Sequence, residues 1–172
     1  MKQRHFRLLA LLLAAVLFCT TLAGCGKKDD SGISALSLSE QLDLGSRYLT
    51  ELDYENAVIA FAAAIELDPQ NTEAYAALYA IYQAQGKTDE ANAIWQQMQE
   101  SGVSGTDMVE QVLDKANIIH EAGGNGWSVD LAVAGKALEE GLYRDAQNAF
   151  EAALRKDPSN KDAHAGLYVH RR

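Results

Sequence analysis

From residue 38 onward, apolar residues recur three and four positions apart in segments that are separated by short polar breaks. Ala57, Phe61, Ala64 and Ile65 form one such set. On a helix with 3.6 residues per turn, this spacing places all four side chains on one face. The pattern therefore predicts a series of amphipathic helices joined by short loops.

Composition and helix-end signals agree with this prediction. The chain holds 28 alanines and only two prolines, and alanine has the highest helix propensity of all residues. Ser37 with Glu40 predicts a capping box at the start of the first helix. Gly86 and Gly141 follow helical segments, where a left-handed residue commonly ends a helix. We therefore expect an all-α fold.

One helical pattern occurs twice with the same spacing. A tyrosine, an alanine, a phenylalanine, a second alanine and an Asp-Pro pair follow one another between Tyr54 and Pro69, and again between Tyr143 and Pro158. Both intervals are 15 positions long. This arrangement resembles the tetratricopeptide (TPR) repeat, a helix–turn–helix unit of 34 residues. A single hairpin of this kind cannot bury its own apolar face, so the resemblance implies several stacked units.

The resemblance assigns three ranges of the chain after residue 37, and an extra segment lies between the first two. Residues 38–105 match two TPR units, of which the second departs from the family pattern at Tyr79, where a small residue is usual. Residues 127–160 match a third unit, and residues 161–172 match the start of a further or capping helix. Together they imply a short α-solenoid.

An extra segment, residues 106–126, separates the second unit from the third. Its apolar residues lie on one stripe, which predicts a single amphipathic helix over Thr106–Ala122 that caps the first two units. The glycine-rich sequence Gly123–Gly126 predicts a bend or hinge before the third unit. The stripe residues are Met108, Val112, Ala116 and Ile119.

The first 24 residues have the pattern of a secretory signal peptide. Met1–Arg7 is basic, and Leu8–Thr20 is an apolar run of 13 residues, shorter than the roughly 20 residues that a membrane span needs. The sequence Leu22–Cys25 resembles the lipobox of bacterial lipoproteins. The resemblance implies cleavage before Cys25, a lipid on its sulfur, and a flexible tether over residues 25–37. The alternative is an ordinary signal peptide with a chance cysteine.

Charge and reactive side chains narrow the function further. Loss of the leader, with its three basic residues, changes the net charge from −9 to −12, which argues against nucleic acid as a partner. Cys19 leaves with the leader and Cys25 carries the lipid, so no thiol remains for catalysis. The spacing of His164 and His170 matches no metal site. We expect neither enzymatic activity nor a metal or cofactor.

In the TPR family, the first helices of successive units line a concave groove that binds proteins or peptides. The resemblance implies a groove of small and apolar residues here, which suits a partner helix or an extended apolar segment. Alternatively, some of these leucines pack against the extra helix and fill the groove. The implied groove positions are Leu42, Ser46 and Leu49 in the first unit, Glu73, Ala76, Ala80 and Gln83 in the second, and Leu131, Gly135 and Leu138 in the third.

These expectations combine into one hypothesis. The chain is a protein-binding scaffold, held on the extracytoplasmic side of the cell membrane by a lipid on Cys25. In a cell with two membranes the outer membrane is a further location. The alternative is a passive lipoprotein tether, or the N-terminal fragment of a longer lipoprotein whose activity lies beyond residue 172.

Overall fold

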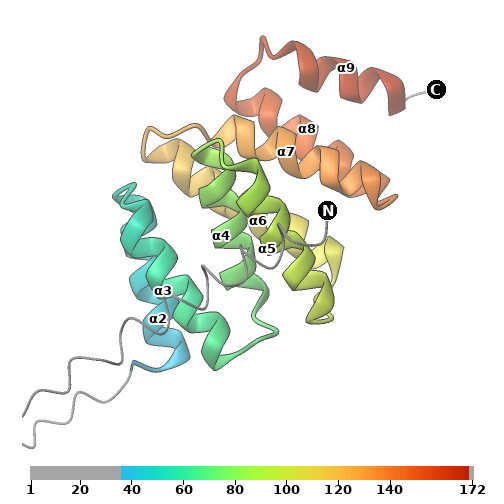
Figure 1. The fold of residues 1–172 in the computed structure, drawn as a ribbon. Helices are drawn as coiled ribbons and strands as arrows, with labels where there is room; N and C mark the ends of the chain where they lie inside the picture. Colours follow the sequence, from blue (N-terminus) through green and yellow to red (C-terminus); the bar gives the residue numbers. More distant parts are fainter. Residues whose placement is uncertain (1–35, 171–172) are drawn as a thin grey trace, which may run out of the picture. The chain divides into compact units, whose positions relative to one another are not determined.

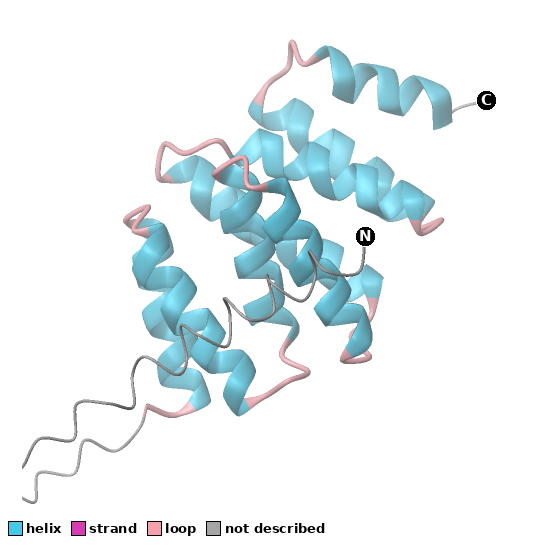
Figure 2. Ribbon diagram, viewed as in Figure 1, coloured by secondary structure: helices cyan, strands magenta, loops and turns pink. Residues whose placement is uncertain are grey.

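The computed structural model describes residues 36–170, and all regular structure in this range is helical (Figures 1 and 2). This confirms the predicted all-α character. Most helices are 13 or 14 residues long, and short loops join them. The helices are α2 (Leu38–Thr50), α3 (Tyr54–Leu67), α4 (Thr72–Ala84), α5 (Thr88–Glu100), α6 (Gly105–Glu121), α7 (Gly126–Glu139), α8 (Tyr143–Lys156) and α9 (Lys161–His170).

The predicted helix ends are present. The Glu40 backbone N–H donates to the Ser37 hydroxyl at 3.4 Å, and the Ser37 backbone N–H donates to the Glu40 carboxylate at 2.8 Å. These two bonds are the expected capping box. The Ser37 backbone N–H and the Ser37 hydroxyl both donate to the Glu40 carboxylate, and they hold the pKa of Glu40 below its usual range. Gly86 and Gly141 have φ angles of +71° and +75°, the left-handed conformation that glycine adopts without strain.

The two Asp-Pro loops have the same local structure. The side-chain oxygens of Asn71 and Asn160 each accept a hydrogen bond at 3.0 Å from the backbone N–H three residues later. The side-chain amides of the same residues donate to Asp68 and Asp157, at 3.4 and 3.3 Å. The repeat in the sequence therefore corresponds to a repeated helix start, at α4 and at α9.

Antiparallel neighbours form three helical hairpins, α2 with α3, α4 with α5, and α7 with α8. Helix α4 is central, since it contacts α3, α5, α6 and α7, and its residues from Ala74 to Ile81 are all buried. Small residues allow close packing inside a hairpin. A side chain added at Gly45 would begin only 2.8 Å from the Phe61 ring.

The extra segment forms α6, and its predicted apolar stripe is buried. Helix α6 packs along α4 and α7 and also contacts α2 and α8. It therefore does more than cap the first two hairpins, because it also joins them to the third. Gly123, with a φ angle of +91°, follows its last turn, and the chain bends there before α7 begins at Gly126.

The predicted leader, Cys25 and the tether up to residue 35 lie outside the described residues. Within residues 36–170, no helix combines the length and the apolar character that a membrane span requires.

Candidate functional site

Helix α6 covers the predicted groove positions on one face of α4. Glu73, Ala76 and Ala80 are three and four residues apart and therefore share that face. Ala76 and Ala80 are fully buried, and the Glu73 carboxylate accepts a hydrogen bond from the Nζ atom of Lys115 on α6. This part of the expected groove is filled, so Ala76 and Ala80 offer no surface to a partner.

The predicted positions on α2 also belong largely to the core. Leu49 is fully buried. Leu42 and Ser46 are half-buried, and Leu42 packs against the core. On α7, Leu138 is likewise half-buried against the core. A charged substitution at Leu49 would therefore disturb folding before it tested binding.

The other three predicted positions lie together in an open groove between α4, α5 and α7, which we call the α4–α7 groove. Gln83 lies near the end of α4, and Leu131 and Gly135 lie one turn apart on α7. The groove has a volume of about 390 Å³. Its other lining residues are Tyr79, Thr88, Asn92, Ala132, Lys136 and Glu139.

Tyr79, one of the lining residues, carries a buried hydroxyl group close to the Gln83 side chain. Tyr79 is fully buried, and no hydrogen-bond partner of ordinary geometry is placed at its hydroxyl oxygen. Burial raises the pKa of Tyr79 far above its usual value, while the neighbouring Gln83 side chain opposes this shift. The hydroxyl is therefore protonated at neutral pH. An unpaired buried polar group costs stability, but this oxygen is closed off from the open part of the groove, so the other lining residues are the ones that a ligand can contact.

Contacts behind the groove hold its walls in place. The Trp95 Nε1 atom on α5 donates to the carboxylate of Glu140, just after α7, and the Gln99 side-chain amide donates to the same oxygen. The Trp95 ring packs on the Tyr79 ring, with 5.3 Å between centroids. These contacts connect α4, α5 and the end of α7, so the groove does not depend on flexible loops.

The groove lining combines polar and apolar side chains and has no net charge. Thr88, Asn92 and Gln83 can donate and accept hydrogen bonds, whereas Leu131 and Ala132 are apolar. The Lys136 Nζ atom lies 2.9 Å from the Glu139 carboxylate, so the two rim charges neutralise each other. Such a lining can pair with the backbone amides of a peptide and accommodate small apolar side chains.

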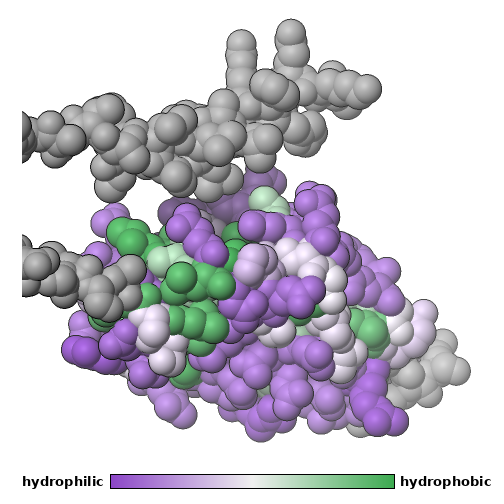
Figure 3. Space-filling view, turned by 90° about the horizontal axis from the view of Figure 1, so that it is seen from below, coloured by the Kyte–Doolittle hydropathy of each residue, from purple (hydrophilic) through white to green (hydrophobic). Residues whose placement is uncertain are grey.

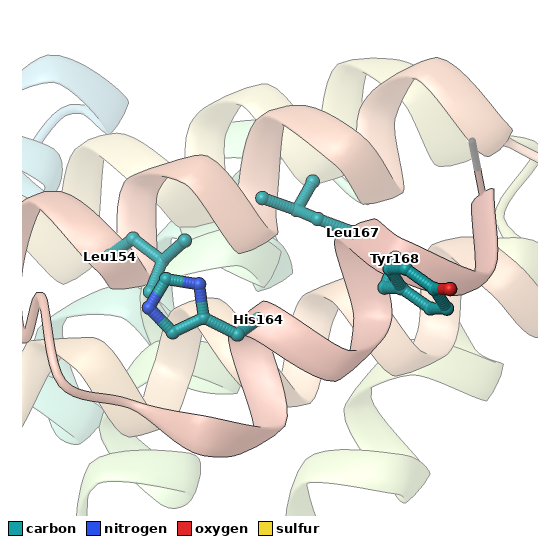
Figure 4. A pocket seen from close by; sticks show the side chains of 4 residues that line it. All are labelled: Leu154, His164, Leu167 and Tyr168. Carbon is teal, nitrogen blue, oxygen red and sulfur yellow. The ribbon is translucent and has the colours of Figure 1, made fainter.

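A second hollow of about 390 Å³ lies between α8 and α9 (Figure 4). It is lined by Leu154 of α8 and by His164, Leu167 and Tyr168 of α9. Its lining is mainly apolar, and the His164 ring nitrogen is already within hydrogen-bond distance of the Pro158 carbonyl, at 3.0 Å. This hollow offers fewer hydrogen-bonding groups than the α4–α7 groove.

Metal ligands do not gather in the described part of the chain. Among residues 36–170, no three histidine, cysteine, aspartate or glutamate side chains are placed to hold a metal ion. A scan against known protein families finds no model that matches this chain, and a search of curated proteins finds no match either.

Sequence reasoning missed several residues of the groove. Tyr79 did carry a signal, because it stands where the TPR pattern has a small residue. Thr88 and Asn92 carried none, because they lie on the second helix of a hairpin, whereas the resemblance points to the first helices. Their role depends on where α7 packs, and the periodicity of α7 does not specify that.

Proposed function

We propose that this protein is a lipid-anchored, extracytoplasmic scaffold that binds a protein or peptide segment in the α4–α7 groove. Binding, and not chemistry, is its activity in this proposal. The observation that carries it is the meeting of Gln83, Leu131 and Gly135 in one open groove, with Thr88 and Asn92 on its opposite side. The groove suits an extended, uncharged segment with small apolar side chains.

We further propose that the helical hairpins are TPR-type units. Support comes from the recurrence of the Asp-Pro loop, with the same asparagine and aspartate hydrogen bonds, 89 residues apart in the chain. The hairpins α2–α3 and α7–α8 occupy equivalent positions in this repeat. Stacked hairpins of this type present the long surfaces that repeat proteins use for binding.

The groove is tested by substituting Gly135. A side chain added there meets no atom within 4 Å, so Gly135→Glu should place a charge in the groove without disturbing the fold. Asn148→Glu on the exposed face of α8 is the matched control. After chemical crosslinking on native membranes, we expect a defined protein to co-purify with wild type and with Asn148→Glu, but not with Gly135→Glu. Equal capture by all three chains would contradict the proposal.

The lipid anchor is tested separately. Cys25→Ala removes the proposed lipidation site, and we expect the protein to leave the membrane fraction, because each buried methylene of the lipid contributes about 0.8 kcal/mol to anchoring. Retention of Cys25→Ala in the membrane fraction would refute the lipobox reading, while the groove proposal would stand on its own test.

A passive spacer is the second candidate function. The observation that favours it is the cover of α4 by α6, which removes Ala76 and Ala80 from any binding surface. In that case the hairpins only set a distance from the membrane. The Gly135 experiment distinguishes the two candidates, because a spacer has no partner to lose.

A further inference from the structure

Helix α3 presents an apolar outer face to solvent. Ile59 is 67% exposed, and Ala62 three residues later is also exposed. Leu67, which is 53% exposed, ends the helix on a neighbouring side. Glu55 and Glu66 lie at the two ends of the face that holds Ile59 and Ala62, since residues three, four and seven apart share one side of a helix. We call Glu55, Ile59, Ala62 and Glu66 the α3 outer face. Figure 3 shows apolar surface on the side where α2 and α3 lie in Figure 1.

The equivalent helix of the internal repeat shows that the fold does not require this apolar face. Position 59 corresponds to Asn148 of α8, which is exposed and polar, and position 62 corresponds to Glu151. The core positions, in contrast, are the same in both helices, with Phe61 matching Phe150. Selection for stability accounts for the shared core. It does not account for the solvent-exposed Ile59 in α3, where the equivalent position in α8 holds Asn148.

The charges of the two helices are opposite. Arg144 and Arg155 of α8 occupy the positions that Glu55 and Glu66 occupy in α3. Helix α3 carries no lysine or arginine. Its outer face is therefore an apolar centre with a carboxylate at each end. A complementary surface has an apolar centre with a cation at each end.

We propose that the α3 outer face docks a helix of a partner protein, one whose apolar stripe is flanked by lysine or arginine side chains. This surface is independent of the α4–α7 groove, because α3 contributes no residue to that groove. The scaffold would then hold two partners, or two segments of one partner, at the same time. Such double attachment raises the overall affinity beyond that of either contact.

Two other occupants fit the surface less well. Helices that lie in a membrane interface carry basic residues and large aromatic anchors, whereas the α3 outer face has neither. In a symmetric dimer through α3, the two helices run either antiparallel or parallel. Glu55 of one copy then faces Glu66 of the other, or each glutamate faces its own counterpart. Such like charges repel each other. The charge pattern therefore favours a basic partner helix.

The test uses two synthetic helical peptides of about 18 residues, a length at which a helix is stable enough to present a face. Both carry the same leucine and alanine stripe, and one has flanking lysines where the other has flanking glutamates. The full-length chain is reconstituted in phosphatidylcholine vesicles, and peptide binding is measured by fluorescence anisotropy against empty vesicles. We expect the lysine peptide to bind at least about tenfold more tightly than the glutamate peptide.

The variants are taken from α8, where the same fold tolerates the new residues. Ile59→Asn should weaken binding of the lysine peptide about tenfold, as expected for loss of a buried isoleucine. Glu55→Arg with Glu66→Arg should reverse the preference between the peptides. The control pair Glu110→Arg with Glu121→Arg, on exposed positions of α6, changes the net charge equally and should leave the preference unchanged.

Several results would overturn this inference. Binding that ignores Ile59→Asn, or that does not discriminate between the peptides, rules out the α3 outer face as the docking surface. Self-association that Ile59→Asn abolishes identifies a second copy as the occupant. Circular dichroism checks that each variant is folded. Because no groove residue is changed, failure here leaves the proposed function standing.

Discussion

The buried ion pair between Asp130 and Lys156 provides a sharp test of the packing between α7 and α8. The Lys156 Nζ atom donates to the Asp130 carboxylate at 2.6 Å, and the two side chains are only 6% and 0% exposed. The other carboxylate oxygen of Asp130 has no hydrogen-bond partner. Lys156→Leu removes this ion pair and leaves the Asp130 carboxyl group buried, with only the weaker electrostatic effects of Arg155 and His120.

The cost of this substitution should depend strongly on pH. Burial raises the pKa of Asp130 from 3.8 to about 6, although Lys156 opposes the shift. The folded state therefore binds the proton more tightly than the unfolded state. The contribution of Asp130 to stability is greatest below pH 3.8 and is lost as the pH rises through 6. The total loss of unfolding free energy over this range is about 3 kcal/mol. Loss of Lys156 raises this pKa further.

We therefore expect Lys156→Leu to lower the free energy of unfolding by about 3–5 kcal/mol near pH 7.5, where Asp130 is charged. Near pH 4.5, where Asp130 is protonated, the loss should fall below about 1 kcal/mol. Urea unfolding followed by circular dichroism, with wild type measured at each pH, gives both values.

A double variant removes both charges at once. The positions equivalent to Asp130 and Lys156 in the first hairpin hold the uncharged residues Gln41 and Leu67, so the substitutions Asp130→Gln and Lys156→Leu are combined. The double variant should recover most of the stability lost at neutral pH. The reasoning is refuted if Lys156→Leu costs the same at both pH values, or if the double variant is as unstable as the single one.

Three further predictions concern stability. Lys115→Met should cost only about 1 kcal/mol near neutral pH, because the Glu73 side chain is 39% exposed and can turn to water; a loss as large as that of Lys156→Leu in urea unfolding would contradict this. Tyr79→Phe should raise the free energy of unfolding by about 1 kcal/mol through removal of an unpaired hydroxyl, and a loss would show that the hydroxyl is paired. Gly135→Ala, in an open helical position, should raise the melting temperature. Gly141→Ala, at a φ of +75°, should lower the melting temperature, because it costs about 1 kcal/mol of unfolding free energy. Opposite signs in thermal unfolding would refute the backbone roles assigned to the two glycines.

Helix positions could be predicted from the sequence because their signals are local. The predicted helix Thr106–Ala122 is present as α6 with bounds one residue earlier at each end. The capping box at Ser37 depends on residues three apart. Such features need no knowledge of the rest of the fold.

Tertiary contacts could not be predicted in the same way. Periodicity shows that one face of α4 is apolar, but it does not show that α6 is the helix that covers it. Lys115 and Asp130 lie on buried faces despite their charge, and their ion-pair partners are 42 and 26 residues away in the chain. A hydrophobic pattern cannot identify such partners. The α4–α7 groove depends on the same unknown, the place where α7 packs.

We propose that a partner segment occupies the α4–α7 groove. Site-specific photo-crosslinking in the native cell tests it most directly, with a photoreactive residue at Ala132 in the groove or at Gln147 on the exposed side of α8. We expect a single defined adduct from position 132, which is lost when Gly135→Glu is added, and no such adduct from position 147. No adduct from position 132, or the same adduct from both positions, would contradict it.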